Sequence, residues 1–454
     1  MTVDLYLHNG LIVTEESVAK GGLVVDQGKV VEIVSTNAKV VANQIIDLNG
    51  KVLLPGLVDG HVHFHAPGRD YWEGYITGSQ AAAAGGVTTI IDMPLNGIPP
   101  TIDALKLQEK RDRIAHEPVV DYAHWAGLIP NNLSDLVGLH ANGVVGFKCF
   151  MSGAATEEFT NVKDDTMYAG LLQARQLGSL VGVHAENFEL IDSFEKKLHT
   201  EGRIDRLAWL ESRPPVTELE AVHRALFWAK ETGGKMHIVH TSIRSGIDMV
   251  THAKNEGVNV TVETCPHFLT FTDQDFLIVG PELKCDPPLR SRETVEALWE
   301  SLLAGEIDTV GSDHAPCTVA EKEEGLENIW KAWSGITGIQ ATLPVLLTEG
   351  VHKRGLKLNR LVKLIAGNPA RIFGLYPRKG ALLPGSDADF VIVDINQEWK
   401  MEKEEILSKN KHSPYVGFPF KGKVEQTYVR GQMVFDRGSI TAEPGYGRLV
   451  LRNN

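Results

Sequence analysis

Eight apolar runs rich in β-branched residues alternate with longer helical stretches between about residues 52 and 376. Strands that are buried on both faces have this composition, and helices between them imply parallel pairing. Eight such units in roughly 320 residues favour a (β/α)8 TIM-like barrel of the α/β class. A doubly wound open sheet is the alternative, but no glycine-rich phosphate-binding sequence follows the first run. The runs are Val52–Val58, Val87–Met93, Val119–Leu128, Val144–Phe150, Leu180–His184, Met236–His240, Val258–Val262 and Ile307–Gly311.

Two of the intervening helices carry boundary signals. Thr217 and Glu220 form a capping-box pattern ahead of the segment LEAVHRALFWAK, which predicts that a helix begins after Thr217. The segment IRSGIDMVTHAKNEG ends at Gly257, and glycine commonly follows the last turn of a helix. We therefore expect a second helix that stops at Gly257.

The two ends of the chain have a different pattern, with short strands and tight turns. Asn9-Gly10 lies between apolar runs, which is a strong hairpin signal, and Gln27-Gly28 marks a second turn. The segment QIIDLNGKVLLPG predicts a third antiparallel pair, and strand-like segments return in GALLPGSDADFVIVD and KVEQTYVRGQMVFDRG. We predict a small discontinuous β-sandwich of residues 1–52 and 377–454 beside a barrel of residues 53–376. A separate C-terminal β module is the alternative.

Ionisable residues recur at the carboxyl ends of the predicted barrel strands. Each one alone has a structural explanation, such as a hydrogen-bonded core histidine or a helix cap. Buried ionisable side chains are nevertheless rarely left unpaired, and barrel active sites are built at this end of the strands. We therefore expect the six side chains to converge. They are His61, His63, Lys148, His184, His240 and Asp313.

The residue types in this set predict two bound metal ions. Residues i and i+2 of a strand point to the same face, so His61 and His63 present two imidazoles side by side. Neutral imidazole is a common ligand for transition metals. We assign one ion to His61, His63 and Asp313, and a second ion to His184 and His240. Zinc is the expected metal, although cobalt, manganese or nickel would accept the same ligands.

Lys148 occupies the position where an anion is needed to bridge two cations. A lysine inside an apolar strand is rare unless it is paired, and its ammonium form would be repelled by both metals. A desolvated, neutral amine that captures carbon dioxide becomes a carbamate, whose two oxygens can bridge the ions. We therefore interpret Lys148 as an N6-carboxylated bridging ligand.

With these residues in view, the chain resembles the binuclear amidohydrolases, and more narrowly the cyclic amidohydrolases: dihydroorotases, dihydropyrimidinases (hydantoinases) and allantoinases. The resemblance covers nearly the whole chain. The strings APGRDYWEG, DMPLNGIPPT, GVVGFKCF, SRPPVTELEAV, CPHF, KCDPPLR, SDHAPC, KAWSGITGIQ and SPYVG are most similar to the bacterial allantoinases. This resemblance implies ring opening of (S)-allantoin to allantoate in purine catabolism, with a hydantoinase or dihydropyrimidinase acting on cyclic ureides as the alternative.

Three departures from the related families bear on the substrate. Dihydroorotases carry an arginine that grips the substrate carboxylate at the position of His65, so the missing arginine disfavours that activity. Dihydropyrimidinases usually carry a tyrosine in the loop after the fourth strand, whereas Tyr168 comes only after the segment MSGAATEEFTNVKDD. Similar enzymes often have a small residue or asparagine at the position of Asp286, so a carboxylate is expected near the pocket.

The resemblance also implies a mechanism and a set of substrate contacts. A hydroxide bridging the two metals attacks the ring carbonyl, and Asp313 accepts its proton and passes it to the departing ring nitrogen. The candidate substrate-binding residues lie in segments that follow predicted strands. They are Asn96, His267, Cys285, Cys317 and His65. A core role remains the alternative for His267 and for both cysteines.

Bulk composition narrows the partners. The net charge of −13 argues against a nucleic acid or an anionic membrane as a partner. Four cysteines without a C-x-x-C pair indicate reduced thiols in the cytoplasm, and the sequence contains neither a signal-peptide pattern nor a membrane-spanning run. By analogy with the family we expect a homotetramer. A scaffold protein that has lost its ligands and a mononuclear barrel deaminase are the remaining alternatives, and Lys148 disfavours both.

Overall fold

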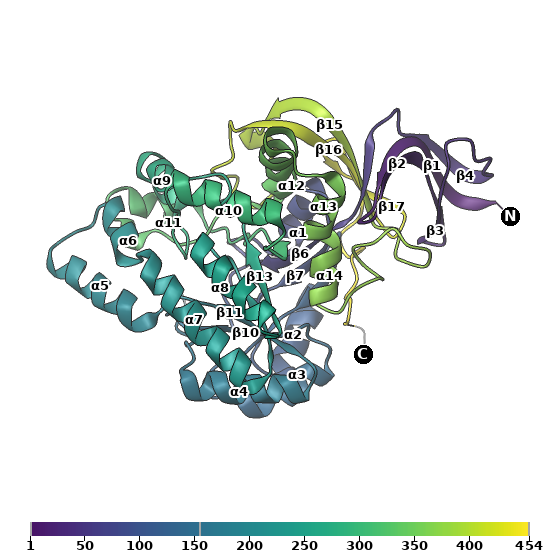
Figure 1. The fold of residues 1–454 in the computed structure, drawn as a ribbon. Helices are drawn as coiled ribbons and strands as arrows, with labels where there is room; N and C mark the ends of the chain where they lie inside the picture. The colour runs from purple at the N-terminus through teal and green to yellow at the C-terminus, as the bar shows by residue number, and fades with distance from the viewer. Residues whose placement is uncertain (1, 154–155, 453–454) are drawn as a thin grey trace.

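The computed structural model describes residues 2–153 and 156–452. Within these ranges, a barrel of parallel strands lies beside a β-sandwich built from both chain ends, and the two termini lie on the same side of the molecule (Figure 1). The predicted α/β fold, a (β/α)8 barrel with a terminal sandwich, is therefore confirmed. Residues 1, 453 and 454 of the predicted sandwich lie outside the described ranges.

The barrel strands form two parallel sheets whose neighbouring edges meet. β8 pairs with β7, and β9, which follows β8 along the same stretch of chain, pairs with β10. A parallel bridge between Val62 and His314 joins the first barrel strand to the segment after the last one and closes the ring. The strands are β6 (Leu57–Val62), β7 (Val87–Asp92), β8 (Asp121–His124), β9 (Ala126–Gly127), β10 (Phe147–Phe150), β11 (Leu180–His184), β12 (Lys235–Ile238), β13 (Val260–Thr264) and β14 (Thr309–Val310).

Helices on the outside of the barrel cover these strands (Figure 1). The helix that was predicted to begin after Thr217 begins two residues earlier, because α7 starts at Pro215. The Thr217 hydroxyl lies inside this helix and donates to the Pro214 carbonyl at 2.8 Å. Proline at the first helical position explains the early start. The helix before Gly257 ends as predicted. The helices are α1 (Tyr75–Ala84), α2 (Ala104–Ile114), α3 (Leu136–Ala141), α4 (Asp164–Gln176), α5 (Phe188–Thr200), α6 (Arg206–Ser212), α7 (Pro215–Thr232), α8 (Arg244–Asn255), α9 (Asp273–Val279), α10 (Arg292–Ala304), α11 (Val319–Glu323), α12 (Thr342–Val345), α13 (Leu358–Val362) and α14 (Asn368–Ile372).

Trp125 fills the barrel interior. Its ring meets Phe373 edge-on at 5.2 Å, and its Nε1–H donates to the Gly60 carbonyl at 2.9 Å. A Cβ at Gly182 would lie 2.8 Å from the Trp125 ring, so this strand passes close to the indole only because residue 182 is glycine. The barrel interior around Trp125 is thus packed with side chains.

Strands from both chain ends form the terminal β-sandwich, in the hydrogen-bonded order β18-β17-β16-β15-β5-β1-β2-β3 with β4 on β1. β5 joins the two ends, because it pairs with β1 in parallel and with β15 antiparallel. The strands are β1 (Val3–Val13), β2 (Val18–Asp26), β3 (Lys29–Val34), β4 (Ala42–Asp47), β5 (Val52–Pro55), β15 (Phe390–Lys400), β16 (Pro419–Val429), β17 (Gln432–Asp436) and β18 (Ser439–Ile440).

Three local predictions for this region are wrong. Asn9-Gly10 is not a hairpin turn: β1 continues through it with a bulge, and β4 and β5 both pair with β1 in parallel rather than with each other. The run Val52–Val58 is not one barrel strand, since β5 belongs to the sandwich and β6 begins at Leu57. The turn at Gln27-Gly28 between β2 and β3 is confirmed. We propose residues 1–52 and 377–454 as one structural unit, which β5 extends to Pro55.

A buried charge cluster ties the barrel to the sandwich. The Lys379 ammonium forms ion pairs with Asp387 at 2.9 Å, with Asp389 at 2.7 Å and with Asp121 on β8. Arg430 on the sandwich side also pairs with Asp121. Because these carboxylates are buried, their charge must be balanced locally. Lys379 provides part of that balance, together with Arg430 on Asp121 and Lys29 on Asp387. Among the described residues, no helix has the length and hydropathy that a membrane span requires.

Candidate metal centre

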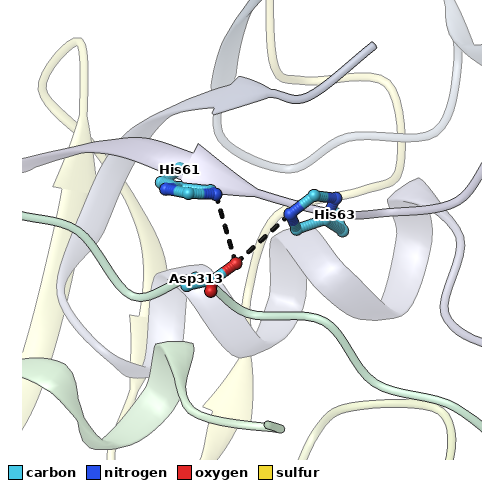
Figure 2. Close-up of side chains that lie close together, drawn as sticks. All are labelled: His61, His63 and Asp313. Atoms are coloured by element: carbon cyan, nitrogen blue, oxygen red, sulfur yellow. Dashed lines mark ion pairs between the residues drawn. The ribbon is translucent and has the colours of Figure 1, made fainter. Parts of the chain in front are cut away.

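His61 and His63 project from the end of β6 toward Asp313, which follows β14 (Figure 2). The Nε2 atoms of both imidazoles lie 3.2 Å from the same carboxylate oxygen, Oδ1 of Asp313. The backbone of Asp313 has φ of 46°, a left-handed conformation that costs energy outside glycine and is often found at functional sites. Three ligand atoms that share one point in this way can hold one cation.

A buried glutamate fixes the orientation of the first histidine. Nδ1–H of His61 donates to Oε1 of Glu263 on β13 at 2.7 Å, so Nε2 keeps its lone pair on the side of Asp313. Burial alone would raise the pKa of Glu263, but His61 and His237 outweigh it and set the pKa to about 2. Glu263 is therefore ionised and acts as the acceptor that a metal-ligating histidine usually needs.

His184 and His240 form a second pair of facing imidazoles. Nδ1 of His184 lies 2.9 Å from Nε2 of His240, and Nε2–H of His184 donates to Glu186 at 2.8 Å. Phe150 stacks on the His184 ring with a centroid distance of 4.5 Å. The carboxylate and the aromatic ring together hold Nδ1 of His184 toward His240, so both nitrogens are available to one ion.

Lys148 lies on β10 and is fully buried. Its Nζ makes no hydrogen bond to any described residue and lies 4.8 Å above the Phe150 ring. Burial lowers the pKa of Lys148 to about 8. A larger fraction of this amine is therefore neutral than in an exposed lysine. An unpaired buried amine is costly, so its position beside four histidines and an aspartate fits a group that is completed by a further ligand.

All six predicted ligands line one cavity, together with Asn96, Cys285 and Asp286. The Asn96 side-chain amide lies 3.3 Å from Nδ1 of His63. The ligand atoms of His61, His63 and Asp313 lie within 4.8 Å of one another, which fits one ion held by nitrogen and carboxylate donors. The facing nitrogens of His184 and His240, 2.9 Å apart, offer donors for a second ion. The six side chains singled out by the strand-end pattern thus lie around one cavity, and their role as metal ligands stays a prediction.

Three of the predicted substrate contacts do not line this cavity among the described residues: His65, His267 and Cys317. His65 packs edge-on against Trp72 and Trp333, with ring-centroid distances of 5.0 and 6.3 Å. Cys317 is buried, and its carbonyl accepts a hydrogen bond from His412 at 2.8 Å.

His267 lies behind Asp313, with Cys265 near both of them. Burial lowers the pKa of His267 to about 4, which keeps the ring neutral. Tyr168 lies on α4 and contacts Trp228, away from the cavity. Residues 154 and 155 of the loop before it are outside the described ranges.

Several functional neighbours were missed by sequence reasoning. Glu263 accepts a hydrogen bond from His61, and Glu186 accepts one from His184. Both could have been identified from the sequence, because each is an acidic residue at the end of an apolar strand. Arg213 was missed because nothing in the sequence links it to the strand ends. It forms an ion pair of 3.1 Å with Asp286, the carboxylate that was expected near the pocket.

The chain is similar in sequence and in structure to proteins of one known family. A model of the amidohydrolase family matches residues 52–434. The chain is 41% identical to the allantoinase of Deinococcus radiodurans, with 99% of each chain covered, and 43% identical to that of Rubrobacter xylanophilus, with 97% of each covered. Among solved structures, the L-hydantoinase (dihydropyrimidinase) of Arthrobacter aurescens superimposes with a TM-score of 0.97 at 36% identity, over 99% of this chain and 100% of that one. The chain therefore belongs to the amidohydrolase family, in the group of the allantoinases.

Proposed function

We propose that this protein is an allantoinase, a metal-dependent hydrolase that opens the ring of (S)-allantoin to give allantoate. The observation that carries the proposal is Lys148, a buried amine that has no hydrogen-bond partner among the described residues and that lines the same cavity as the four histidines. The allantoinase relatives, about 40% identical over almost the whole chain, support the substrate.

His61, His63 and Asp313 would hold one divalent ion, and His184 and His240 would hold the second. The carbamate of Lys148 would bridge them, formed when the neutral amine adds to carbon dioxide and loses a proton. When bound, the two ions would polarise the ring carbonyl and make a water molecule acidic enough to attack it. We propose zinc as the metal, because its preferred ligands are imidazole and carboxylate.

Asp313 is placed to move the proton of the reaction. Its side chain is 15% exposed, whereas the His61 side chain is 1% exposed, so its second oxygen can reach a molecule in the cavity. Burial alone would raise the pKa of Asp313, but the neighbouring histidines hold it well below its usual range. An ionised Asp313 would accept the proton of the attacking water and deliver it to the ring nitrogen that departs.

Asn96 and Cys285 would help to orient the ring, since both line the cavity beside the ligands. Asn96 is anchored by its contact with His63, so its remaining polar atom would be held in a fixed direction. Oriented contacts of this kind raise the rate by placing the carbonyl for attack.

A hydantoinase or dihydropyrimidinase is the second candidate, favoured by the superposition on the Arthrobacter aurescens structure. Initial rates on allantoin, hydantoin, dihydrouracil and dihydroorotate, with and without a chelator, separate the two. The proposal predicts the highest kcat/KM on allantoin and loss of all activity with the chelator. A higher kcat/KM on hydantoin or dihydrouracil would favour the second candidate.

We also propose a cytoplasmic homotetramer acting in purine catabolism. Val216 and Phe227 on α7 are each 50% exposed, and Ile278 on α9 is 78% exposed, which suits contacts between subunits. Light scattering of the purified protein tests the assembly: a mass of four chains is expected, and a monomer would contradict it.

A further inference from the structure

An outer cavity of about 550 Å³ adjoins the metal cavity. The two cavities share Gly153, Asp286, Trp333 and Ser334. A ring held at the metal centre would therefore extend any substituent past these residues into the outer cavity. Residues at such a junction are in a position to select among substituents.

Asp286 is the ionisable member of the shared set, and its side chain is 26% exposed. Its Oδ1 lies 3.1 Å from Nε of Arg213, yet neither atom makes a well-aligned hydrogen bond with another described residue. Oδ1 is buried against Arg213, so the ion pair balances the charge of the carboxylate at that oxygen. The second oxygen, Oδ2, makes no hydrogen bond with a described residue and is the acceptor left for the cavity. Asp286 therefore remains able to accept hydrogen bonds from a molecule in the cavity.

Two cations near Asp286, those of Arg213 and Lys284, are bound by protein groups. Nη1 of Arg213 donates to Glu195 at 2.6 Å, and its guanidinium lies 3.8 Å from the centre of the Trp209 ring. Nζ of Lys284 donates to the Ala332 carbonyl at 2.6 Å. Both cations are thus held in place by protein groups, whereas Asp286 offers an acceptor.

We propose that Asp286 determines specificity by accepting hydrogen bonds from the N–H groups of an uncharged, urea-type substituent on the cyclic ureide. The inference rests on the proposed function and deepens it. A ureido group presents several N–H donors, and bonds from N–H groups to a charged acceptor are stronger than neutral ones. The same carboxylate repels a ring that carries a carboxylate. Asp286 would therefore favour binding of ureido-bearing rings and disfavour binding of carboxylate-bearing rings.

The test compares allantoin, which carries a ureido group, with hydantoin, which lacks it, and with dihydroorotate, which carries a carboxylate. For Asp286→Asn, kcat/KM on allantoin is expected to fall by about 10- to 100-fold, mainly through KM. On hydantoin it should stay within about twofold of the wild-type value, because no interaction with that ring is lost. Activity on dihydroorotate relative to hydantoin should rise.

Glu211→Gln is the matched control. Glu211 pairs with Arg203 at the same 3.1 Å, and neither residue lines either cavity, so the ratio of allantoin to hydantoin activity should not change. Thermal unfolding and metal content check that each variant is folded and loaded, with Asp286→Ser as a second substitution. Equal losses on allantoin and hydantoin would overturn the inference alone. A wild-type protein that opens neither ring would instead overturn the proposed function.

Discussion

His61 and Glu263 are joined by a hydrogen bond of 2.7 Å between Nδ1 and Oε1, although they lie 202 residues apart in the sequence. The contact connects the first barrel strand to the seventh, which both neighbour the eighth strand in the ring. It sets which nitrogen of His61 faces Asp313. The proposed metal centre therefore depends on a carboxylate that need not touch the metal.

Glu263→Gln should lower metal affinity by about 10- to 100-fold, because the amide is a weaker acceptor for His61 than the carboxylate. Competition with a chelating dye measures the affinity, and activity should recover at high metal concentration. Glu282→Gln is the matched control: Glu282 bonds to Nδ1 of His412 at 2.9 Å, away from the metal cavity. Equal metal affinity in Glu263→Gln and wild type would refute the role assigned to Glu263.

Asp313→Asn should reduce kcat by about 10²- to 10⁴-fold, since the amide cannot accept the proton of the attacking water. Steady-state kinetics on allantoin, with metal content measured on the same sample, separates loss of proton transfer from loss of metal. A fully metal-loaded variant with wild-type kcat would contradict the assignment of Asp313 as the proton carrier.

Lys148→Ala should bind fewer metal ions and lose activity, because the bridging carbamate cannot form. Added propionate should restore part of both, since a small carboxylate fits the space left by the side chain and can bridge two cations. Elemental analysis and initial rates measure the two effects. A variant that still carries two ions at full activity would show that Lys148 is not a bridge.

Lys379→Met should destabilise the protein by about 3–5 kcal/mol, because it leaves the buried carboxylate of Asp389 without its cation and leaves Asp121 with Arg430 alone. Lys29→Met is the matched control: Lys29 also pairs with Asp387, but its side chain is 48% exposed, so a loss of at most about 1 kcal/mol is expected. Urea unfolding gives both values. Similar losses for the two variants would mean that the buried cluster does not hold the barrel and the sandwich together.

Ionisation of Asp387 should make the free energy of unfolding depend on pH. Burial opposes ionisation of this carboxyl, but Lys379 and Lys29 outweigh it and lower its pKa from 3.8 to about 2. A lowered folded-state pKa stabilises the fold above the unfolded value, and this stabilisation is lost as the pH falls from about 4 to 2. Urea unfolding across that range should show a shallower decline in Asp387→Asn than in wild type. Identical slopes would exclude the effect.

The barrel and the clustering of the six side chains were predictable because both follow from one regularity. Parallel strands end at the same rim, so His61, His184 and Asp313 must approach one another once the strands are identified. The N-terminal region was less predictable. Asn9-Gly10 suits a bulge as well as a turn, and the choice depends on β1 pairing with β4 and β5, which no local pattern encodes.

The cavity wall could not be derived for a similar reason. Arg213 follows α6, Asp286 lies in a loop before α10, and their pairing depends on how α6 packs. His65 and Cys317 were expected as substrate contacts because of the family resemblance, with a core role as the alternative for Cys317. A resemblance does not fix side-chain direction, however, and both point into aromatic or buried surroundings instead.

Anomalous X-ray diffraction from crystals of the purified protein, collected at the absorption edge of the bound metal, tests the central claim most directly. The account predicts two metal peaks in each chain, one at His61, His63 and Asp313 and one at His184 and His240, with a carboxylated Lys148 between them. A single peak, no peak, or two peaks beside an unmodified Lys148 amine would contradict it.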